Sequence, residues 1–153
     1  MNPKEISYFL SVINDYFTTV SKAKPETGVP FLKEEHSSII QDMTGIIGIS
    51  GLKKGAVYFT ASKEMLLELY KEIFGNNENP DTFTLADLVG EISNTISGNL
   101  RDFYGEHFLI SVPIVCIGKE TEIRIKIPIP VFVIPIKWKN HTSYLVAGLE
   151  EGI

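Results

Sequence analysis

One stretch of the chain restricts its possible folds more than any other. Residues 84–104, TLADLVGEISNTISGNLRDFY, carry apolar side chains at steps of three and four, a spacing that predicts one long amphipathic helix. We expect its apolar side to pack on an antiparallel sheet. That side consists of Leu85, Leu88, Val89, Ile92, Ile96, Leu100 and Phe103.

The opposite side of this predicted helix is polar. Asp87, Glu91 and Asn94 are spaced at i, i+4 and i+7, so they lie one turn above another. We call these three residues the polar strip and expect them to face solvent. Taken alone, Glu-x-x-Asn on a helix is usually a solvated surface, and Asp87 is usually a helix-start residue.

Three further features belong to this helix. Thr84 is the predicted N-cap, with Asp87 as its capping-box partner. Gly90 and Gly98 lie in the predicted interior, where glycine costs about 1 kcal/mol relative to alanine. Such glycines indicate the close approach of another backbone, from this chain or from a partner.

The residues before this helix predict two more helices and a hairpin. A helix is expected from Asn2 to about Val20, and another begins at an N-cap, Ser62, and ends at Gly75. Between them we expect strands at 29–33, within 36–50 and at 56–60, the last two joined by the turn 51–55.

The residues after it are rich in strand patterns. A strand at 108–117 is interrupted by Pro113, and residues 122–127 alternate isoleucine with charged side chains. Strands at 131–138 and 143–149 are expected to pair across Lys139-Asn140. The order of elements predicts an α+β fold with a largely antiparallel sheet, and we expect residues 1–153 to form a single domain.

Composition excludes some classes of function. The formal net charge is −5, and scattered lysines on an acidic domain argue against nucleic acid and anionic membranes. The N-terminus has no signal-peptide core, and the longest apolar stretch, 127–138, contains three prolines and a lysine. A cytoplasmic protein is expected, and the single cysteine, Cys116, is expected in the core.

Several kinds of site are also disfavoured. The chain has neither a GxxxxGK[ST] nor a GxGxxG loop. His36, His107 and His141 lie in separate predicted elements without ligand spacing, so we expect no metal site. No Cys–His or Ser–His pair is suggested by the local sequence. The polar strip is therefore the leading candidate for chemistry.

A family resemblance strengthens that choice. The segments MNPKEISYFLSVINDYF, TGIIGISGLKKGAVYFTAS, ADLVGEISNTISGNLR and ISVPIVCIGK resemble the CheC and CheX family of chemotaxis phosphatases, and its CheX branch most closely. The family signature is Asp or Ser, three residues, Glu, two residues, Asn, and a later proline. Here it matches Asp87, Glu91, Asn94 and Pro113, with a shorter gap before the proline. A second Glu-x-x-Asn helix, usual in CheC proteins, is not found.

The resemblance implies a phosphatase that acts on a phosphorylated CheY-like response regulator. By similarity, Asn94 orients the attacking water and Glu91 pairs with a lysine of the regulator. The regulator itself supplies the phosphorylated aspartate and Mg²⁺, so this chain is expected to bind no cofactor. Asp87, Gly90, Gly98 and Pro113 are expected near the docked partner, although Asp87 can equally serve only as a cap.

The resemblance also implies a homodimer, for which the apolar, proline-marked residues 127–138 offer an interface; alternatively, these residues are simply core.

Two other functions are compatible with the sequence. One is a binding or dimerisation module that docks a regulator without catalysis. The other is an assembly part related to flagellar-switch domains, which the single motif disfavours.

Overall fold

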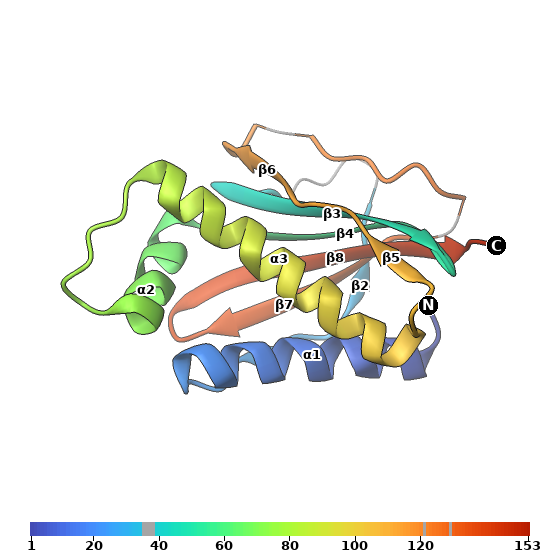
Figure 1. Ribbon diagram of the computed structural model, residues 1–153, viewed down its shortest axis with the longest axis horizontal. Coiled ribbons are helices and arrows are strands. Elements are labelled where there is room, and N and C mark those ends of the chain that lie inside the picture. Colours follow the sequence, from blue (N-terminus) through green and yellow to red (C-terminus); the bar gives the residue numbers. More distant parts are fainter. Residues whose placement is uncertain (35–38, 121, 129) are drawn as a thin grey trace.

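A single antiparallel sheet forms the centre of the computed structural model, which describes residues 1–34, 39–120, 122–128 and 130–153. Its path runs β1-β7-β8-β4-β3-β5, with β2 also on β7 and β6 also on β3 (Figure 1). The strands are β1 Glu26–Thr27, β2 Phe31–Leu32, β3 Met43–Gly51, β4 Lys53–Ala61, β5 Phe108–Ile110, β6 Ile114–Ile117, β7 Phe132–Trp138 and β8 His141–Glu151.

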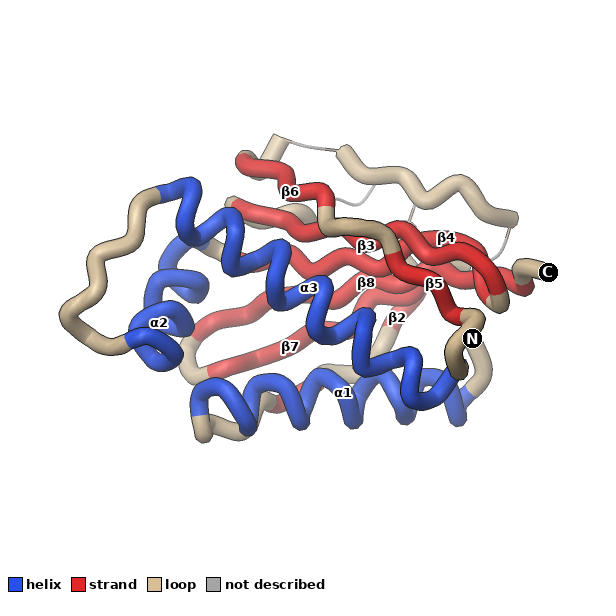
Figure 2. Tube along the Cα trace, viewed as in Figure 1, coloured by secondary structure: helices blue, strands red, loops and turns tan. Residues whose placement is uncertain are grey.

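Among the residues that the structure describes, three helices cover one face of this sheet, as the tube in Figure 2 shows. They are α1 Pro3–Ser21, α2 Lys63–Phe74 and α3 Thr82–Tyr104. Their apolar sides share one buried cluster with the strand residues of that face. The α+β prediction, with three helices on a largely antiparallel sheet, is confirmed.

The start of the long helix differs from the prediction. Asp81 is the N-cap of α3, and its carboxylate accepts a hydrogen bond from the backbone N–H of Thr84. Thr84 therefore lies inside the first turn, and Asp87 is not its capping-box partner. Asp81 prevails because a carboxylate can also accept from the Thr84 hydroxyl, at 2.8 Å. The N-cap predicted at Ser62 is present, and Asn2, where the first helix was expected to begin, is the N-cap of α1.

The other face of the sheet corrects a strand prediction. Residues 122–127 form no strand, although their alternation is real. Ile123 and Ile125 pack against a second cluster of Tyr58, Val133 and Val146. This segment covers the outer face of the sheet with its isoleucines and does not extend the sheet, because side-chain alternation requires only an extended chain above an apolar surface.

The apolar residues of β7 are core and not an interface. Val133, Ile134, Ile136 and Trp138 are fully buried within the chain, so of the two interpretations of 127–138 these residues support core and not an interface. Pro135 lies between the part of β7 that pairs with β1 and the part that pairs with β2, where its missing N–H interrupts no strand pairing. Its carbonyl accepts a hydrogen bond from the backbone N–H of Gly28 at 2.9 Å.

In the part of the chain that the structure describes, no helix has the length and apolar character needed to cross a membrane.

Candidate functional site

The polar strip runs along the outward side of α3. Asp87 and Glu91 are exposed, and Asn94 is half-buried. On the opposite side, Leu85, Val89, Ile92, Ile96 and Leu100 are almost completely buried. Neighbours at i and i+3 on a helix have Cβ atoms about 5–6 Å apart, so Glu91 and Asn94 present a carboxylate and a carboxamide to the same patch of solvent.

A close contact with the sheet fixes the orientation of this helix. The Ser93 hydroxyl donates to the carbonyl of Gly45 at 2.8 Å and to that of Val89 at 3.0 Å. A Cβ on Gly45 would lie 2.5 Å from Ser93 Oγ and 2.6 Å from Val89 O, nearer than any Cβ can approach. Because residue 45 is glycine, α3 lies directly on β3. Ser93, which stands between Glu91 and Asn94 in the sequence, holds the helix there through its hydrogen bond to Gly45.

Gly90 is buried beneath β6. A Cβ at Gly90 would lie 2.9 Å from Val115 Cγ2 and 3.6 Å from Pro113 Cβ. The close neighbour of this glycine is thus the chain's own β6 and the proline that precedes it. The same contact places Pro113 beside the polar strip, although the gap before it is shorter than in the family signature.

Gly98 lies one turn beyond Asn94 and is more open. A Cβ there would meet only Ile110 Cδ1, at 4.0 Å. Packing within the chain therefore leaves room for a larger side chain at Gly98. Its expected role in docking a partner stays a prediction.

A tyrosine from α1 borders the strip on the side away from β6. Tyr16 is buried, with 8% of its surface exposed, and α1 packs alongside α3. Burial raises the pKa of the Tyr16 phenol, and the negative charge of Glu91 raises it further. Tyr16 therefore stays a neutral hydroxyl in the electrostatic vicinity of Glu91. Sequence patterns gave no sign of this neighbour, because it comes from a distant helix.

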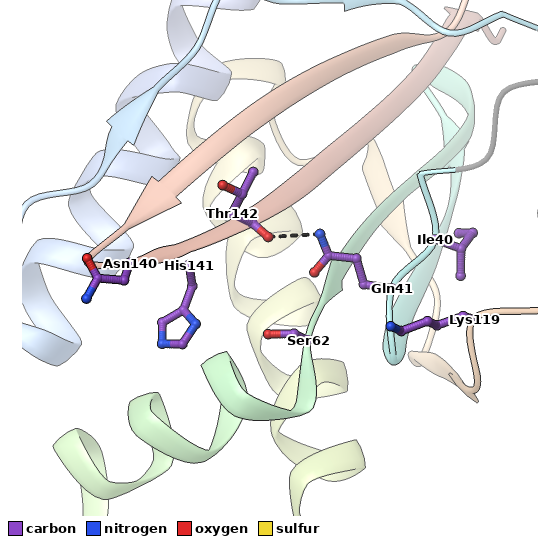
Figure 3. Close-up of a pocket in the computed structure, with 7 residues that line it drawn as sticks. All are labelled: Ile40, Gln41, Ser62, Lys119, Asn140, His141 and Thr142. Carbon is purple, nitrogen blue, oxygen red and sulfur yellow. Dashed lines mark hydrogen bonds between the residues drawn. The ribbon is translucent and has the colours of Figure 1, made fainter.

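A separate shallow pocket of about 390 Å³ lies where β3, β8 and the start of α2 meet (Figure 3). None of the sequence-predicted site residues lines it. Gln41 bridges it by donating from Nε2 to the carbonyl of Thr142 at 2.8 Å. His141, which also lines the pocket, contacts Glu68 Oε1 through Nε2 at 3.1 Å. This hydrogen bond is the largest of the effects that lower the pKa of Glu68 below its ordinary value.

The remaining candidate ligands stay apart. Within the described ranges, no three His, Cys, Asp or Glu side chains gather closely enough to hold a metal ion. His36 lies outside the described residues. Cys116 is half-buried on β6, paired in register with Thr44, and so is less buried than expected.

Comparisons with known proteins identify the family. The family model described as "Chemotaxis phosphatase CheX" matches residues 43–137, a range that contains the polar strip, both helix glycines and Pro113. A relative from Thermotoga maritima, described as CheY-P phosphatase CheX, is 26% identical over 141 residues, covering 86% of this chain and 90% of the relative.

Solved structures share the fold over nearly the whole length. Chemotaxis protein CheX from Desulfovibrio desulfuricans has a TM-score of 0.84 at 25% identity, covering 96% of this chain and 99% of the other. The CheX of a CheX–CheY–BeF3–Mg²⁺ complex from Borrelia burgdorferi has a TM-score of 0.76 at 21% identity, covering 96% and 98%. With a family model matched across the helix and the sheet that hold the polar strip, the chain belongs to the CheX family of chemotaxis phosphatases.

Proposed function

We propose that this chain hydrolyses the aspartyl phosphate of a phosphorylated CheY-like response regulator. The observation that carries the proposal is the outward pairing of Glu91 and Asn94 on a helix that its own sheet holds in place. The Thermotoga maritima relative is described as a phosphatase of phosphorylated CheY, and the Borrelia burgdorferi structure is a complex with CheY.

The reaction places a limited demand on the chain. Water attacks phosphorus in line, a new P–O bond forms, and the bond between phosphorus and the aspartate oxygen breaks to leave a carboxylate and inorganic phosphate. Catalysis of phosphoryl transfer rests mainly on positioning and charge stabilisation. The regulator contributes the phosphorylated aspartate and Mg²⁺, so this chain needs to supply neither a nucleophile nor a metal ligand.

Asn94 is the proposed water-orienting residue. A carboxamide donates and accepts hydrogen bonds at once. It can therefore hold a water in position for in-line attack on phosphorus without bringing a negative charge towards the phosphoryl oxygens. Its half-buried position restricts the side chain before the partner arrives, which reduces the entropy lost on ordering it.

Glu91 is the proposed docking residue. Its carboxylate is exposed and can pair with a lysine of the regulator one helical turn from the water site. Burial and this carboxylate both raise the pKa of Tyr16, which stays a neutral hydroxyl near Glu91.

The proposal includes a homodimer whose contacts leave Glu91 and Asn94 uncovered. Support comes from the family resemblance and from exposed apolar side chains outside the core, such as Ile114 and Ile117 on β6. Light scattering at micromolar concentration tests the dimer: a monomer contradicts it. So does a crosslinked interface that includes Asn94.

The experiment that tests the activity is the decay of a phosphorylated CheY regulator with and without this protein. We expect faster release of inorganic phosphate in proportion to the protein added. A CheX-like module that only docks the regulator is the second candidate, favoured if the regulator binds while its decay rate stays unchanged.

A further inference from the structure

Two bulky apolar side chains are exposed beside the polar strip without a place in the core. Phe83 has 74% of its surface exposed, and Val112 has 83%. Isolated apolar side chains on a surface are ordinary. These two are different because the geometry of α3 and of the β5–β6 connection brings both to the proposed site.

Phe83 continues the line of the polar strip towards the start of α3. Positions 83, 87, 91 and 94 follow steps of four, four and three, so these side chains share one side of the helix. With about 1.5 Å of rise per residue, Phe83 lies about 12 Å along the axis from Glu91. No ring among the described aromatic contacts stacks on Phe83.

Val112 lies level with Asn94. Gly98 of α3 faces Ile110, and Gly90 faces Pro113 and Val115, so the segment 110–115 runs antiparallel to the helix. Asn94 is midway between these two glycines, which places it beside residues 111 and 112. A helix advances about 6 Å in four residues and an extended chain covers a similar distance in two, so the two contacts fix this register.

The segment that carries Val112 is firmly held. Ser111 N donates to the carbonyl of Gly48 at 2.9 Å, and Gly48 N donates to Ser111 Oγ at 2.8 Å. The Ser111 hydroxyl in turn donates to the carbonyl of Val112 at 2.9 Å. These hydrogen bonds hold the backbone of residues 111 and 112 against β3, which fixes the position from which the Val112 side chain projects.

We propose that Phe83 and Val112 are the apolar contacts that seat the phosphorylated regulator on the polar strip. This inference rests on the proposed function and adds the residues that decide how tightly the partner binds. A standard interface buries about 800 Å² on each partner, a patch about 30 Å across. Such a patch centred on Glu91 and Asn94 includes both side chains.

The matching partner surface has a defined chemistry. It has a cation opposite Glu91 and a phosphoryl group opposite Asn94, with apolar side chains around them. This chain presents an acidic and polar centre with an apolar rim, which complements a lysine beside a phosphoryl group with apolar side chains around them. Apolar contacts around a desolvated ion pair exclude water from it, so Phe83 and Val112 act on binding rather than on the chemical step.

The test is steady-state dephosphorylation of a purified CheY regulator, with binding measured on its beryllofluoride complex. We expect Phe83→Ser and Val112→Ser each to raise KM and Kd about tenfold, the loss typical of an interface anchor. The value of kcat should stay within about twofold of wild type, since neither side chain touches the reacting atoms.

Matched controls lie at the opposite edge of the sheet, next to β7. Val29→Ser removes an equally exposed valine (84%), and Phe31→Ser removes a phenylalanine of β2 that is 43% exposed. Both should leave KM unchanged. Should a serine variant melt early, Phe83→Leu and Val112→Thr keep the size of the side chain and should raise KM by a smaller factor.

The outcomes separate this inference from the proposed function. If wild type does not accelerate dephosphorylation, the function fails first. If wild type is active and both serine variants keep the KM and Kd of wild type, the apolar contacts are wrong. A fall in kcat alone overturns the inference as well, and so does a Val112→Ser protein that changes only its oligomeric state, which would assign Val112 to a contact between copies of this chain.

Discussion

The hydroxyl of Ser93 donates a 2.8 Å hydrogen bond to the carbonyl of Gly45, and this bond joins the middle of α3 directly to β3. Its position decides which side of the helix reaches solvent. Because Ser93 points into the sheet, Glu91 and Asn94, two residues before and one after it, point outward. The location of the candidate site therefore follows from one inward contact.

Removing this close approach should destabilise the chain. Gly45→Ala would place a methyl group 2.5 Å from Ser93 Oγ and 2.6 Å from the carbonyl oxygen of Val89. Overpacking of this kind costs about 1–3 kcal/mol of unfolding free energy, measured by urea denaturation. Gly48→Ala, where the new Cβ would be 3.4 Å from Ser111 Oγ, is the control; equal losses in both variants would contradict the explanation.

The two residues of the proposed site should respond differently to truncation. Asn94→Ala should keep most of the affinity for the regulator but return its dephosphorylation to the unassisted rate, since orientation of the water matters in the transition state. Glu91→Ala should weaken binding as well, by about 2–5 kcal/mol, because one partner of a charge pair is lost.

Controls for this pair lie on the same helix. Asn99→Ala alters an exposed asparagine away from the strip and should leave phosphate release unchanged. All three variants should unfold within about 0.5 kcal/mol of wild type. An Asn94→Ala protein with near-normal turnover would reject the proposed mechanism and favour the docking module.

Gly98 offers a test in which stability and function move in opposite directions. The nearest atom to a Cβ at Gly98 is 4.0 Å away, so Gly98→Ala should stabilise α3 by up to about 1 kcal/mol. If the regulator approaches the helix there, the same variant should show a higher KM. Urea denaturation and phosphate release measure the two effects; a more stable protein with an unchanged KM would remove Gly98 from the docking surface.

Stability should depend on pH through Glu5. Its carboxylate accepts from the Tyr104 hydroxyl at 3.1 Å and lies 3.4 Å from Lys53 Nζ. Burial alone would raise the Glu5 pKa, but the Asn2 backbone N–H, Tyr104 and Lys53 outweigh it and hold the pKa below its ordinary value of 4.5. A lowered folded pKa means stabilisation that is fully present above pH 4.5 and is lost as the pH falls through the folded pKa.

The comparison of wild type with Glu5→Gln checks this sign. Wild type should be the more stable of the two by urea denaturation at pH 7, and the difference should shrink as the pH falls below about 4. Glu106→Gln, at an exposed site, is the control with no comparable change. A difference that stays constant from pH 7 to pH 3 would show that the charge of Glu5 is not what stabilises the fold.

The buried indole of Trp138 provides a test at the far end of α1. Trp138 Nε1 donates to Ser21 Oγ at 2.9 Å, and that hydroxyl donates to the carbonyl of Phe17 at 2.6 Å. Ser21→Ala should cost about 1–3 kcal/mol because it leaves a buried donor without an acceptor. Urea unfolding followed by fluorescence of this tryptophan measures the loss; Ser11→Ala, at an exposed site on the same helix, should be neutral.

The sequence predicted the features that depend on local periodicity. The apolar side of α3 and the exposure of Glu91 follow from steps of three and four residues, and the structure has both. Periodicity was misleading at 122–127, where an extended segment alternates without pairing. The N-cap predicted at Thr84 was wrong, because Asp81 and Thr84 are both good N-cap residues and only their hydrogen bond decides between them.

Contacts between distant residues were beyond the reach of the sequence. Gly90 was expected to lie close to another backbone, but its near neighbours are the side chains of Val115 and Pro113, which only the fold identifies. Tyr16 gave no signal at all, since an aromatic residue on the apolar side of a helix is indistinguishable from core. The roles of Glu91 and Asn94 stay predictions that rest on the resemblance and the proposed chemistry.

The division of α3 into an inward and an outward side has a consequence for how such a chain can change over time. Substitutions at Phe83, Asp87, Glu91 or Asn94 alter exposed or half-buried side chains and leave the contacts of Ser93 and the buried leucines in place. Selection for a folded chain therefore acts on the inward side of α3, and selection for activity acts on its outward side. A descendant can lose its chemistry while its melting temperature stays the same.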